Sequence, residues 1–317
     1  MNPWMLAGII AAGALALFLL VVILPTMAIS LRVYNDHLVR RSPDHWRRGV
    51  CSFPDDPEIV EMYRQGGEWH AANGDCARQV GIESDGLKLR GEYYDFGFDK
   101  AVLILSGRTE AVTYGYFFAA PYRALGYNVL LIDDRGHGES DGDRNNVGLR
   151  EFRDVQRWIR FLHDEQGNRK VLLHGVCIGA ATAMYAVTEP GAPDCVEGLV
   201  VDGMYTTFRE TFKTHMILMK RPVFPVLDEV MALIFLHAGR HPGLHGPVYS
   251  IRKLKLPILM LCGREDKFSL PERSQQPFDM CPSRKRIEWF EKGAHSHLRI
   301  NAPEQYDAAI ADFVRTL

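Results

Sequence analysis

Several signatures that would point directly to a function are missing from this 317-residue chain. Its six cysteines include no C-x-x-C pair, which excludes a zinc ribbon and a thioredoxin-type motif and favours reduced thiols. No glycine-rich phosphate or dinucleotide fingerprint occurs, and there are no internal repeats. The 37 Lys and Arg nearly balance the 39 Asp and Glu, so no basic field indicates a nucleic-acid partner. The remaining composition is that of an ordinary globular protein.

Charged side chains are also absent from residues 1–30, where the apolar stretch Trp4–Ile29 exceeds the ~20 residues that cross a bilayer. A cleavable signal peptide would have a basic start and a shorter apolar stretch, and a buried core helix would have a polar face. Residues 1–31 are therefore predicted to be a single-pass membrane anchor. The positive-inside rule predicts a cytoplasmic domain at the cell membrane, because basic residues follow the anchor at Arg32, Arg40, Arg41, Arg47 and Arg48.

From about residue 86 onward, short apolar runs alternate with amphipathic stretches, the pattern of a mostly parallel sheet covered by helices on both faces. The predicted strands are 101–105, 127–133, 170–175, 197–202, 256–262 and 286–290. The predicted helices are 114–125, 150–165, 178–187, 271–280 and 302–317. Residues 87–94 alternate apolar and polar side chains, which predicts an antiparallel edge strand. One domain, 85–317, is sufficient to contain these strands and helices. A polar connector, 32–84, is expected to join it to the anchor.

Residues 204–250 interrupt this alternation with prolines and glycines among large apolar side chains. An insertion of this kind between two strands predicts a lid over a substrate pocket. Its apolar side chains would suit an acyl chain, although they could equally pack onto the core. They are Met204, Phe212, Met216, Ile217, Leu218, Met219, Val223, Phe224, Met231, Leu233, Ile234 and Phe235.

A cysteine stands at the end of the third predicted strand. The run Gly175-Val176-Cys177-Ile178-Gly179 has the G-x-C-x-G pattern of a nucleophile elbow, with sulfur in place of the usual hydroxyl, and a helix of small residues follows it. The glycines would allow the close backbone approach that a strained strand-to-helix turn requires. The motif alone is a weak signal, because a buried packing thiol is the alternative for Cys177.

Two further loops at strand ends carry an acid and a base. Asp266 follows strand 256–262, and His295 follows strand 286–290. With Cys177 these residues have the chain order of a catalytic triad, and ligands bind at the carboxyl ends of strands in open α/β sheets. Glu265 is the rival acid, and His297 is the rival base.

With these three loops in place, the sequence from about residue 85 to the C-terminus resembles an alpha/beta hydrolase, in particular a membrane-anchored member with a serine-aminopeptidase-like core. Residues 133–140 are similar to the family's D-x-R-G-x-G-x-S turn, and residues 302–306 follow the histidine as in the family. Two positions depart from it: Cys177 stands where members usually carry serine, and Ser106-Gly107 where they usually carry His-Gly. The resemblance implies an alpha/beta-hydrolase fold with a lid insertion.

The resemblance also implies roles for the site residues. Cys177 would attack an acyl carbonyl, His295 would move the proton, and Asp266 would orient the imidazole. The backbone N–H groups of Ile178 and Arg108 would hold the oxyanion. We prefer His295 as the base because its spacing from the preceding glycine, and its distance to the tyrosine that follows, resemble the family's placement.

These assignments predict a membrane-tethered hydrolase that cleaves an ester or thioester of a small-molecule or lipid substrate. Two alternatives are an acyltransferase that uses the same thioester and a non-catalytic binding protein that has lost the serine. No cofactor and no metal are expected. His237, His241 and His245 are spaced by four, but the glycines and proline among them interrupt the helix that a metal site of this spacing needs. The sequence does not determine the oligomeric state.

Overall fold

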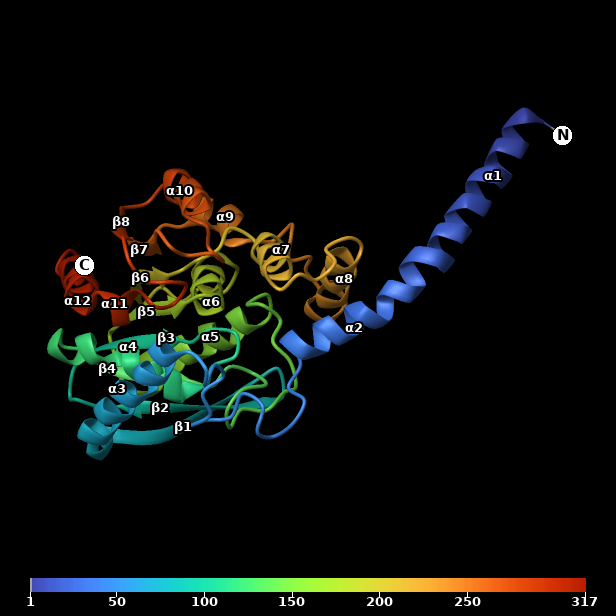
Figure 1. Cartoon of the computed structure of the whole chain (residues 1–317). Helices are drawn as coiled ribbons and strands as arrows, with labels where there is room; N and C mark the ends of the chain where they lie inside the picture. Colours follow the sequence, from blue (N-terminus) through green and yellow to red (C-terminus); the bar gives the residue numbers. More distant parts are fainter. Residues whose placement is uncertain (1) are drawn as a thin grey trace.

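The computed structural model describes residues 2–317, which form one eight-stranded sheet with helices on both faces and a long N-terminal helix that projects away from it (Figure 1). The strands are β1 (Ala77–Ser84), β2 (Leu87–Tyr94), β3 (Lys100–Leu105), β4 (Asn128–Ile132), β5 (Lys170–Val176), β6 (Val196–Asp202), β7 (Ile258–Gly263) and β8 (Lys285–Phe290). The helices are α1 (Pro3–Phe18), η1 (Leu19–Ile23), α2 (Leu24–Leu38), α3 (Pro57–Asn73), η2 (Gly74–Cys76), α4 (Val112–Ala124), α5 (Glu151–Arg160), η3 (Phe161–Glu165), α6 (Ile178–Thr188), α7 (Phe208–Leu218), α8 (Val226–Ala238), α9 (Pro247–Ser250), η4 (Ile251–Lys253), α10 (Pro271–Met280), α11 (Leu298–Asn301) and α12 (Pro303–Val314).

The strand order is β1-β2-β4-β3-β5-β6-β7-β8. Strands β3 to β8 run parallel, whereas β2 is antiparallel to both β1 and β4. The predicted alpha/beta-hydrolase fold is confirmed. The prediction that residues 87–94 form the edge of the sheet is wrong, because β1 pairs outside them. The sheet therefore begins within residues 32–84, which were expected to be a connector.

Helices cover the two faces of the sheet in separate groups. One apolar core contains residues of α5, α6 and the 204–250 insertion, and the other contains residues of α3, α4 and α12. Successive strand side chains point to opposite faces, so Leu103 belongs to the first core while Val102 and Ile104 belong to the second. All three are almost fully buried, as expected for a parallel strand covered on both sides. Strand β5, which leads into the cysteine loop, lies between β3 and β6.

The N-terminal helix is continuous from Pro3 to Leu38 and has a mean hydropathy of 2.9 in its most apolar stretch, none of which is buried. At 1.5 Å per residue, its 36 residues extend about 54 Å, whereas a bilayer core needs only about 20 residues. The helix is therefore long and apolar enough to span a membrane, and it continues past the expected anchor boundary at residue 31. Its C-terminal part packs against α8, where Thr26 donates a 2.7 Å hydrogen bond to Glu229 and Ser30 donates another.

Candidate active site

Cys177 occupies the turn between β5 and α6, the position predicted for a nucleophile elbow. Its φ of 56° and ψ of −113° are strained for a residue with a Cβ atom. Its N–H donates a 2.9 Å hydrogen bond to the carbonyl of Asp202 at the end of β6, which holds the turn against the neighbouring strand. Strain of this kind presents the side chain at the carboxyl edge of the sheet instead of burying it between helices.

The two glycines of the motif are required by close packing. A Cβ atom on Gly175 would overlap the carbonyl oxygen of Gly179, and one on Gly179 would overlap the carbonyl oxygen of Leu105 in β3. In both cases the overlapping atom belongs to the backbone, which cannot move aside as the end of a flexible side chain can. The G-x-C-x-G spacing is therefore explained by the tight contact of α6 with β3 and β5.

His295 and Asp266 meet at the same edge of the sheet. Nδ1 of His295 lies 2.7 Å from Oδ2 of Asp266. The other carboxylate oxygen of Asp266 accepts hydrogen bonds from the N–H groups of Phe268 and Ser269, both at 2.7 Å. With only 4% of its surface exposed, Asp266 is held by three hydrogen bonds in a nearly dry turn. This arrangement fixes the orientation of the imidazole ring.

The charge state of His295 is controlled by its neighbours. Burial lowers the pKa of His295, but the negative charges of Asp266 and Cys177, and hydrogen bonds to both side chains, raise it. The net result is a pKa well above the ordinary value of 6.5. Cys177 and His295 line the same cavity, and His295 contacts Asp266.

The two expected oxyanion donors also lie at this point. Ile178 is the first residue of α6, so its N–H has no carbonyl partner within the helix. Gly107, Arg108 and Cys177 line the same cavity, and a Cβ atom built on Gly107 would lie 3.9 Å from Cβ of Cys177. The ring of His137 holds the Arg108 loop, because it lies 2.6 Å from the carbonyl of Arg108 and 3.0 Å from that of Arg135. The 133–140 turn therefore supports the active-site loop from behind.

A cavity of about 300 Å³ opens above Cys177 and His295, and Arg108 and Ile178 form part of its wall. Its lining surface is mainly apolar, and the aromatic and aliphatic side chains that contribute to it include Phe53, Ile59, Tyr114, Tyr205, Phe208, Phe212 and Phe268. The expectation for the insertion residues is corrected here, because Phe212 alone among the apolar side chains named above lines the cavity. Met204, Met216, Met231 and Ile234 pack into the core, whereas Ile217, Leu218, Met219, Phe224 and Phe235 are exposed.

The rival acid and base have other contacts. Nε2 of His297 lies 3.2 Å from Oδ2 of Asp56, and its Nδ1 lies 2.6 Å from the carbonyl of His295. Glu265 accepts a 3.3 Å hydrogen bond from the N–H of Gly293. Both residues therefore hold the loops that carry the predicted pair, and neither occupies the position between Cys177 and Asp266.

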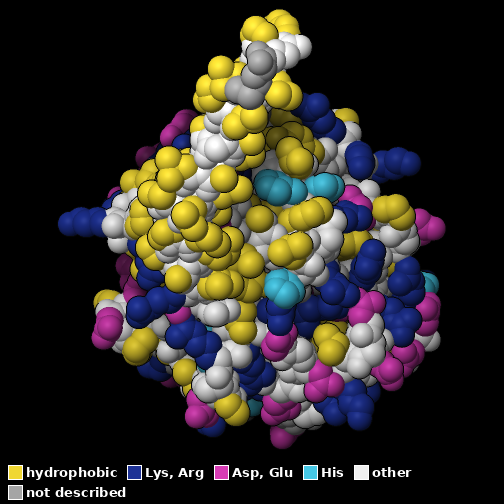
Figure 2. Space-filling model, turned by 90° about the vertical axis from the view of Figure 1, so that its right-hand side faces the viewer, with side chains coloured by type: hydrophobic (Ala, Val, Ile, Leu, Met, Phe, Trp, Pro, Cys, Tyr) yellow, Lys and Arg dark blue, Asp and Glu magenta, His cyan; other side chains and the backbone are white. Residues whose placement is uncertain are grey.

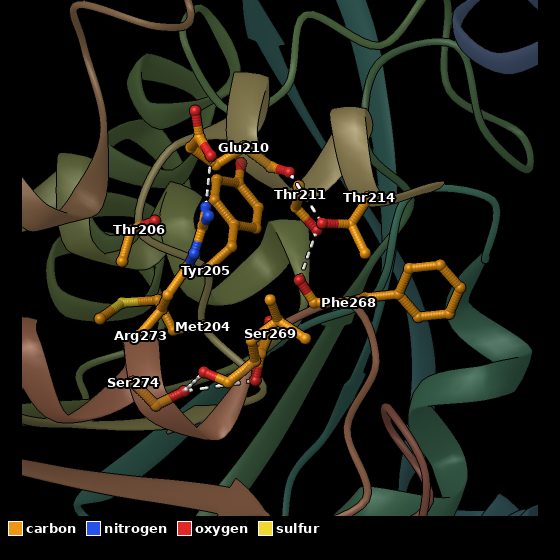
Figure 3. A pocket seen from close by; sticks show the side chains of 11 residues that line it. Met204, Tyr205, Thr206, Glu210, Thr211, Thr214, Phe268, Ser269, Arg273 and Ser274 are labelled. Carbon is orange, nitrogen blue, oxygen red and sulfur yellow. Dashed lines mark hydrogen bonds and ion pairs between the residues drawn. The ribbon is translucent and has the colours of Figure 1, made fainter. Parts of the chain in front are cut away.

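The insertion is attached to the Asp266 loop. Figure 3 shows a smaller pocket between them, in which Thr211 of α7 donates a 2.9 Å hydrogen bond to the carbonyl of Phe268, and Arg273 of α10 pairs with Glu210. Ser269 also donates a 2.6 Å hydrogen bond to the carbonyl of Gly203, at the start of the insertion. Movement of α7 would therefore be transmitted to the acid of the proposed triad.

Sequence reasoning missed two buried acids near the site. Glu110 lines the cavity, and burial raises its pKa to about 7 while a hydrogen bond from Tyr63 opposes the shift. Asp202 accepts a 2.8 Å hydrogen bond from Tyr306, and burial raises its pKa to about 7 as well. The only sequence signal was their position after strands. Among residues 2–317, no three His, Cys, Asp or Glu side chains are placed to hold a metal ion.

Comparisons with known proteins agree with this architecture. The sequence model of the family described as serine aminopeptidase, S33, matches residues 98–234, which include Cys177 but neither Asp266 nor His295. The protein bem46 of Schizosaccharomyces pombe is 28% identical over 197 residues, 61% of this chain, and the match spans only 59% of that relative's length. An uncharacterized membrane protein of Saccharomyces cerevisiae is 27% identical over 242 residues, covering 74% of this chain and 77% of the relative.

Among solved structures, the esterase Pf2001 of Pyrococcus furiosus superposes with a TM-score of 0.62 at 23% identity, over 76% of this chain and 91% of that one. This likeness establishes the alpha/beta-hydrolase fold for the region that it covers. The family match covers residues 98–234, less than half of the chain, and these residues are similar to the serine aminopeptidase family.

Proposed function

We propose that the chain is a membrane-tethered hydrolase that cleaves an ester or thioester through Cys177, His295 and Asp266. The observation that carries the proposal is that the strained elbow, the His295–Asp266 pair and the two backbone donors surround one mostly apolar cavity. The serine aminopeptidase family match supports a hydrolase in general, and the esterase named above supplies a precedent for the fold. The thiol chemistry and the acyl substrate are specific to the proposal.

In the proposed reaction, Sγ of Cys177 attacks the acyl carbonyl carbon, and the oxyanion that forms accepts hydrogen bonds from the N–H groups of Ile178 and Arg108. The raised pKa of His295 favours the imidazolium, which donates its proton to the leaving alcohol or thiol as the carbon–heteroatom bond breaks. The resulting thioester is attacked by water, whose proton passes to His295. Collapse of this second intermediate releases the acid and restores Cys177.

The N-terminal helix supports a membrane setting for this chemistry. In Figure 2, hydrophobic side chains of the helix adjoin further hydrophobic side chains at its base. Exposed apolar residues of α7, α8 and the loop between them form a surface that we call the lid patch: Ile217, Leu218, Met219, Phe224, Phe235 and Leu236. Because α8 packs against the helix where it leaves its most apolar stretch, we infer that the lid patch contacts the bilayer. A lipid acyl group could then reach the cavity without crossing water.

The same proposal places the domain on the cytoplasmic side of the cell membrane. Arg32, Arg41 and Arg47 are exposed just beyond the apolar stretch and would obey the positive-inside rule. Digestion of sealed membrane vesicles by an added protease tests this orientation. Protection of the domain in inside-out vesicles would contradict it.

The catalytic claim is tested with the full-length protein in detergent micelles, using p-nitrophenyl esters and acyl thioesters of increasing chain length. Hydrolysis should disappear in Cys177→Ala, whereas Cys177→Ser should retain ester hydrolysis, because the elbow and the oxyanion donors belong to the backbone. Equal rates for Cys177→Ala and the wild type would exclude the mechanism. Product analysis with an added alcohol or amine separates hydrolysis from acyl transfer.

Thiol labelling separates an enzyme from a binding protein that has lost catalysis. Iodoacetamide at neutral pH should modify Cys177 first, and His295→Ala should slow that labelling. Cys262 is the internal reference, because burial raises the pKa of its thiol to about 12. Labelling of Cys177 as slow as that of Cys262 would favour the binding protein.

A further inference from the structure

One wall of the cavity consists of hydrogen-bond donors that lack an acidic partner. Arg108 and His215 both line the cavity beside Cys177. His215 lies on α7, and Arg108 follows β3, so the two residues reach the cavity from different elements of the fold. Behind them stands His37, the last residue but one of α2, which belongs to the N-terminal helix.

The guanidinium of Arg108 has no counter-ion. Its Nη1 donates a 2.7 Å hydrogen bond to the carbonyl of His37, and no Asp or Glu among residues 2–317 forms an ion pair with it. Burial lowers the pKa of Arg108, opposed by the charges of Cys177 and Glu110. A partly buried cation that is bonded only to a neutral carbonyl is costly without an anion nearby.

The acids that line the cavity are engaged elsewhere. Asp56 interacts with His297 and accepts hydrogen bonds from the first turn of α3. Glu110 accepts a hydrogen bond from Tyr63, and its pKa of about 7 leaves it only partly ionised at neutral pH. Among residues 2–317, neither carboxyl group forms an ion pair with Arg108, although the charge of Glu110 raises the pKa of Arg108.

Two imidazole nitrogens beside Arg108 are also unsatisfied. The rings of His37 and His215 contact each other edge to face, with centroids 5.1 Å apart. Nε2 of each ring is buried without a hydrogen-bond partner. Burial, together with the charges of Arg108 and Arg221, lowers the pKa of His215 to about 4, so this ring is neutral and can offer one N–H group. Buried polar atoms without partners are rare in native proteins, so these two nitrogens need an explanation such as a bound ligand or a water molecule.

We propose that Arg108 and His215, with Arg108 held in place by His37, form a subsite for a negatively charged oxygen group, carboxylate or phosphate, on the acyl substrate. The proposal rests on the proposed function and narrows its substrate class from neutral esters to acidic amphiphiles. The apolar part of the cavity would hold the hydrocarbon chain. The anionic group would lie next to the N-terminal helix, so this helix would help to form the substrate site as well as tether the protein to the membrane.

The main alternative role for Arg108 is to stabilise a thiolate at Cys177. That role predicts the same loss of rate for every substrate, because the thiolate attacks all of them. Anion recognition predicts a loss that depends on the charge of the substrate. The ratio of two kcat/KM values, measured on the same enzyme, therefore separates the two roles.

The test compares p-nitrophenyl pentanoate with mono-p-nitrophenyl glutarate, which carries a carboxylate in place of the terminal methyl group. We expect the wild type to prefer the glutarate by roughly tenfold or more, the factor that a charge-assisted hydrogen bond in a buried site supplies. Arg108→Gln and His215→Leu should abolish the preference, and Arg108→Lys should restore part of it. Lys220→Gln, which removes an exposed charge nearby, is the matched control and should keep the wild-type ratio. Equal ratios in all these proteins would overturn the proposal.

A second measurement does not depend on catalysis. Thermal unfolding of the full-length protein is followed in glutarate, in inorganic phosphate and in chloride of the same ionic strength. The subsite is supported if glutarate or phosphate stabilises the wild type and Lys220→Gln but not Arg108→Gln. The anion that raises the unfolding temperature more shows whether the subsite prefers a carboxylate or a phosphate. Absence of stabilisation in the wild type overturns it. If the anions bind but no ester is hydrolysed, the proposed function fails while the subsite stands.

Discussion

Replacement of Asp266 by Asn gives the sharpest test of the proposed triad. The two side chains have the same shape, but the amide has one oxygen where the carboxylate has two. In the structure one carboxylate oxygen accepts two backbone hydrogen bonds and the other faces Nδ1 of His295. The amide oxygen would keep the hydrogen bonds from the backbone N–H groups of Phe268 and Ser269, and the amide NH₂ would then face the imidazole. Nδ1 must then accept a hydrogen bond, so the ring proton moves to Nε2, the nitrogen that should exchange a proton with Cys177.

Two contributions set the size of the expected fall in kcat for Asp266→Asn. Loss of a hydrogen bond to a charged group is worth about 1.5–3 kcal/mol, or roughly 10- to 150-fold in rate. The wrong tautomer adds to this loss, and the equivalent change in a serine protease lowers kcat about 10⁴-fold. We therefore expect kcat to fall by between about 10² and 10⁴, with KM little changed because Asp266 does not touch the substrate.

The assay is hydrolysis of a p-nitrophenyl ester by the full-length protein, with thermal unfolding as the check on folding. Glu265→Gln is the matched control, since it makes the same chemical change one residue away and should keep the wild-type rate. A fall of less than tenfold in a folded Asp266→Asn protein would refute the role of the carboxylate, because that is below the loss of one charged hydrogen bond. A large fall in Glu265→Gln alone would transfer the role to Glu265.

Three further outcomes are expected. Gly179→Ala should lower the free energy of unfolding by about 1–3 kcal/mol or more through backbone overlap, whereas Gly67→Ala, in open space on α3, should be neutral or slightly stabilising in the same urea titration. Because folding raises the pKa of His295 well above 6.5, its stabilising contribution is complete below about pH 6.5 and is lost as the pH rises through the folded pKa, so the stability difference between wild type and His295→Ala should shrink as the pH rises above about 6.5. Phe224→Ser should slow hydrolysis of bilayer-embedded substrates but not of short soluble esters. The control is Phe98→Ser, an exposed phenylalanine in the loop between β2 and β3; equal effects of Phe224→Ser on both substrates would contradict contact between the lid patch and the bilayer.

Several elements could be predicted closely because their signals are local. Helix α10 has the bounds that the sequence predicts, and the ends of the strands from β3 to β8 differ from the prediction by at most two residues. Buried parallel strands are continuous apolar runs, so they stand out from the helices between them. The elbow was detectable because steric overlap forces glycine on both sides of Cys177.

Strand β1 lacked such a signal. Only Val80 and Ser84 are buried among its residues, because it lies at the edge of the sheet with one side facing solvent. The apolar side chains of residues 204–250 posed a different difficulty. Their hydrophobicity is the same whether they line a cavity, fill the core or face a bilayer, so their separate positions depend on how α7 and α8 pack.

The sequence by itself determined the membrane-length helix, the parallel sheet and the order in the chain of the residues proposed as nucleophile, acid and base, since each of these follows from hydrophobic period, glycine sterics or loop position. Only the tertiary structure decided that His295, and not His297, meets Asp266, and that His37 of the N-terminal helix contacts Arg108 at the cavity. The physical reason is that these contacts join residues far apart in the chain, and their geometry depends on how distant elements pack in three dimensions.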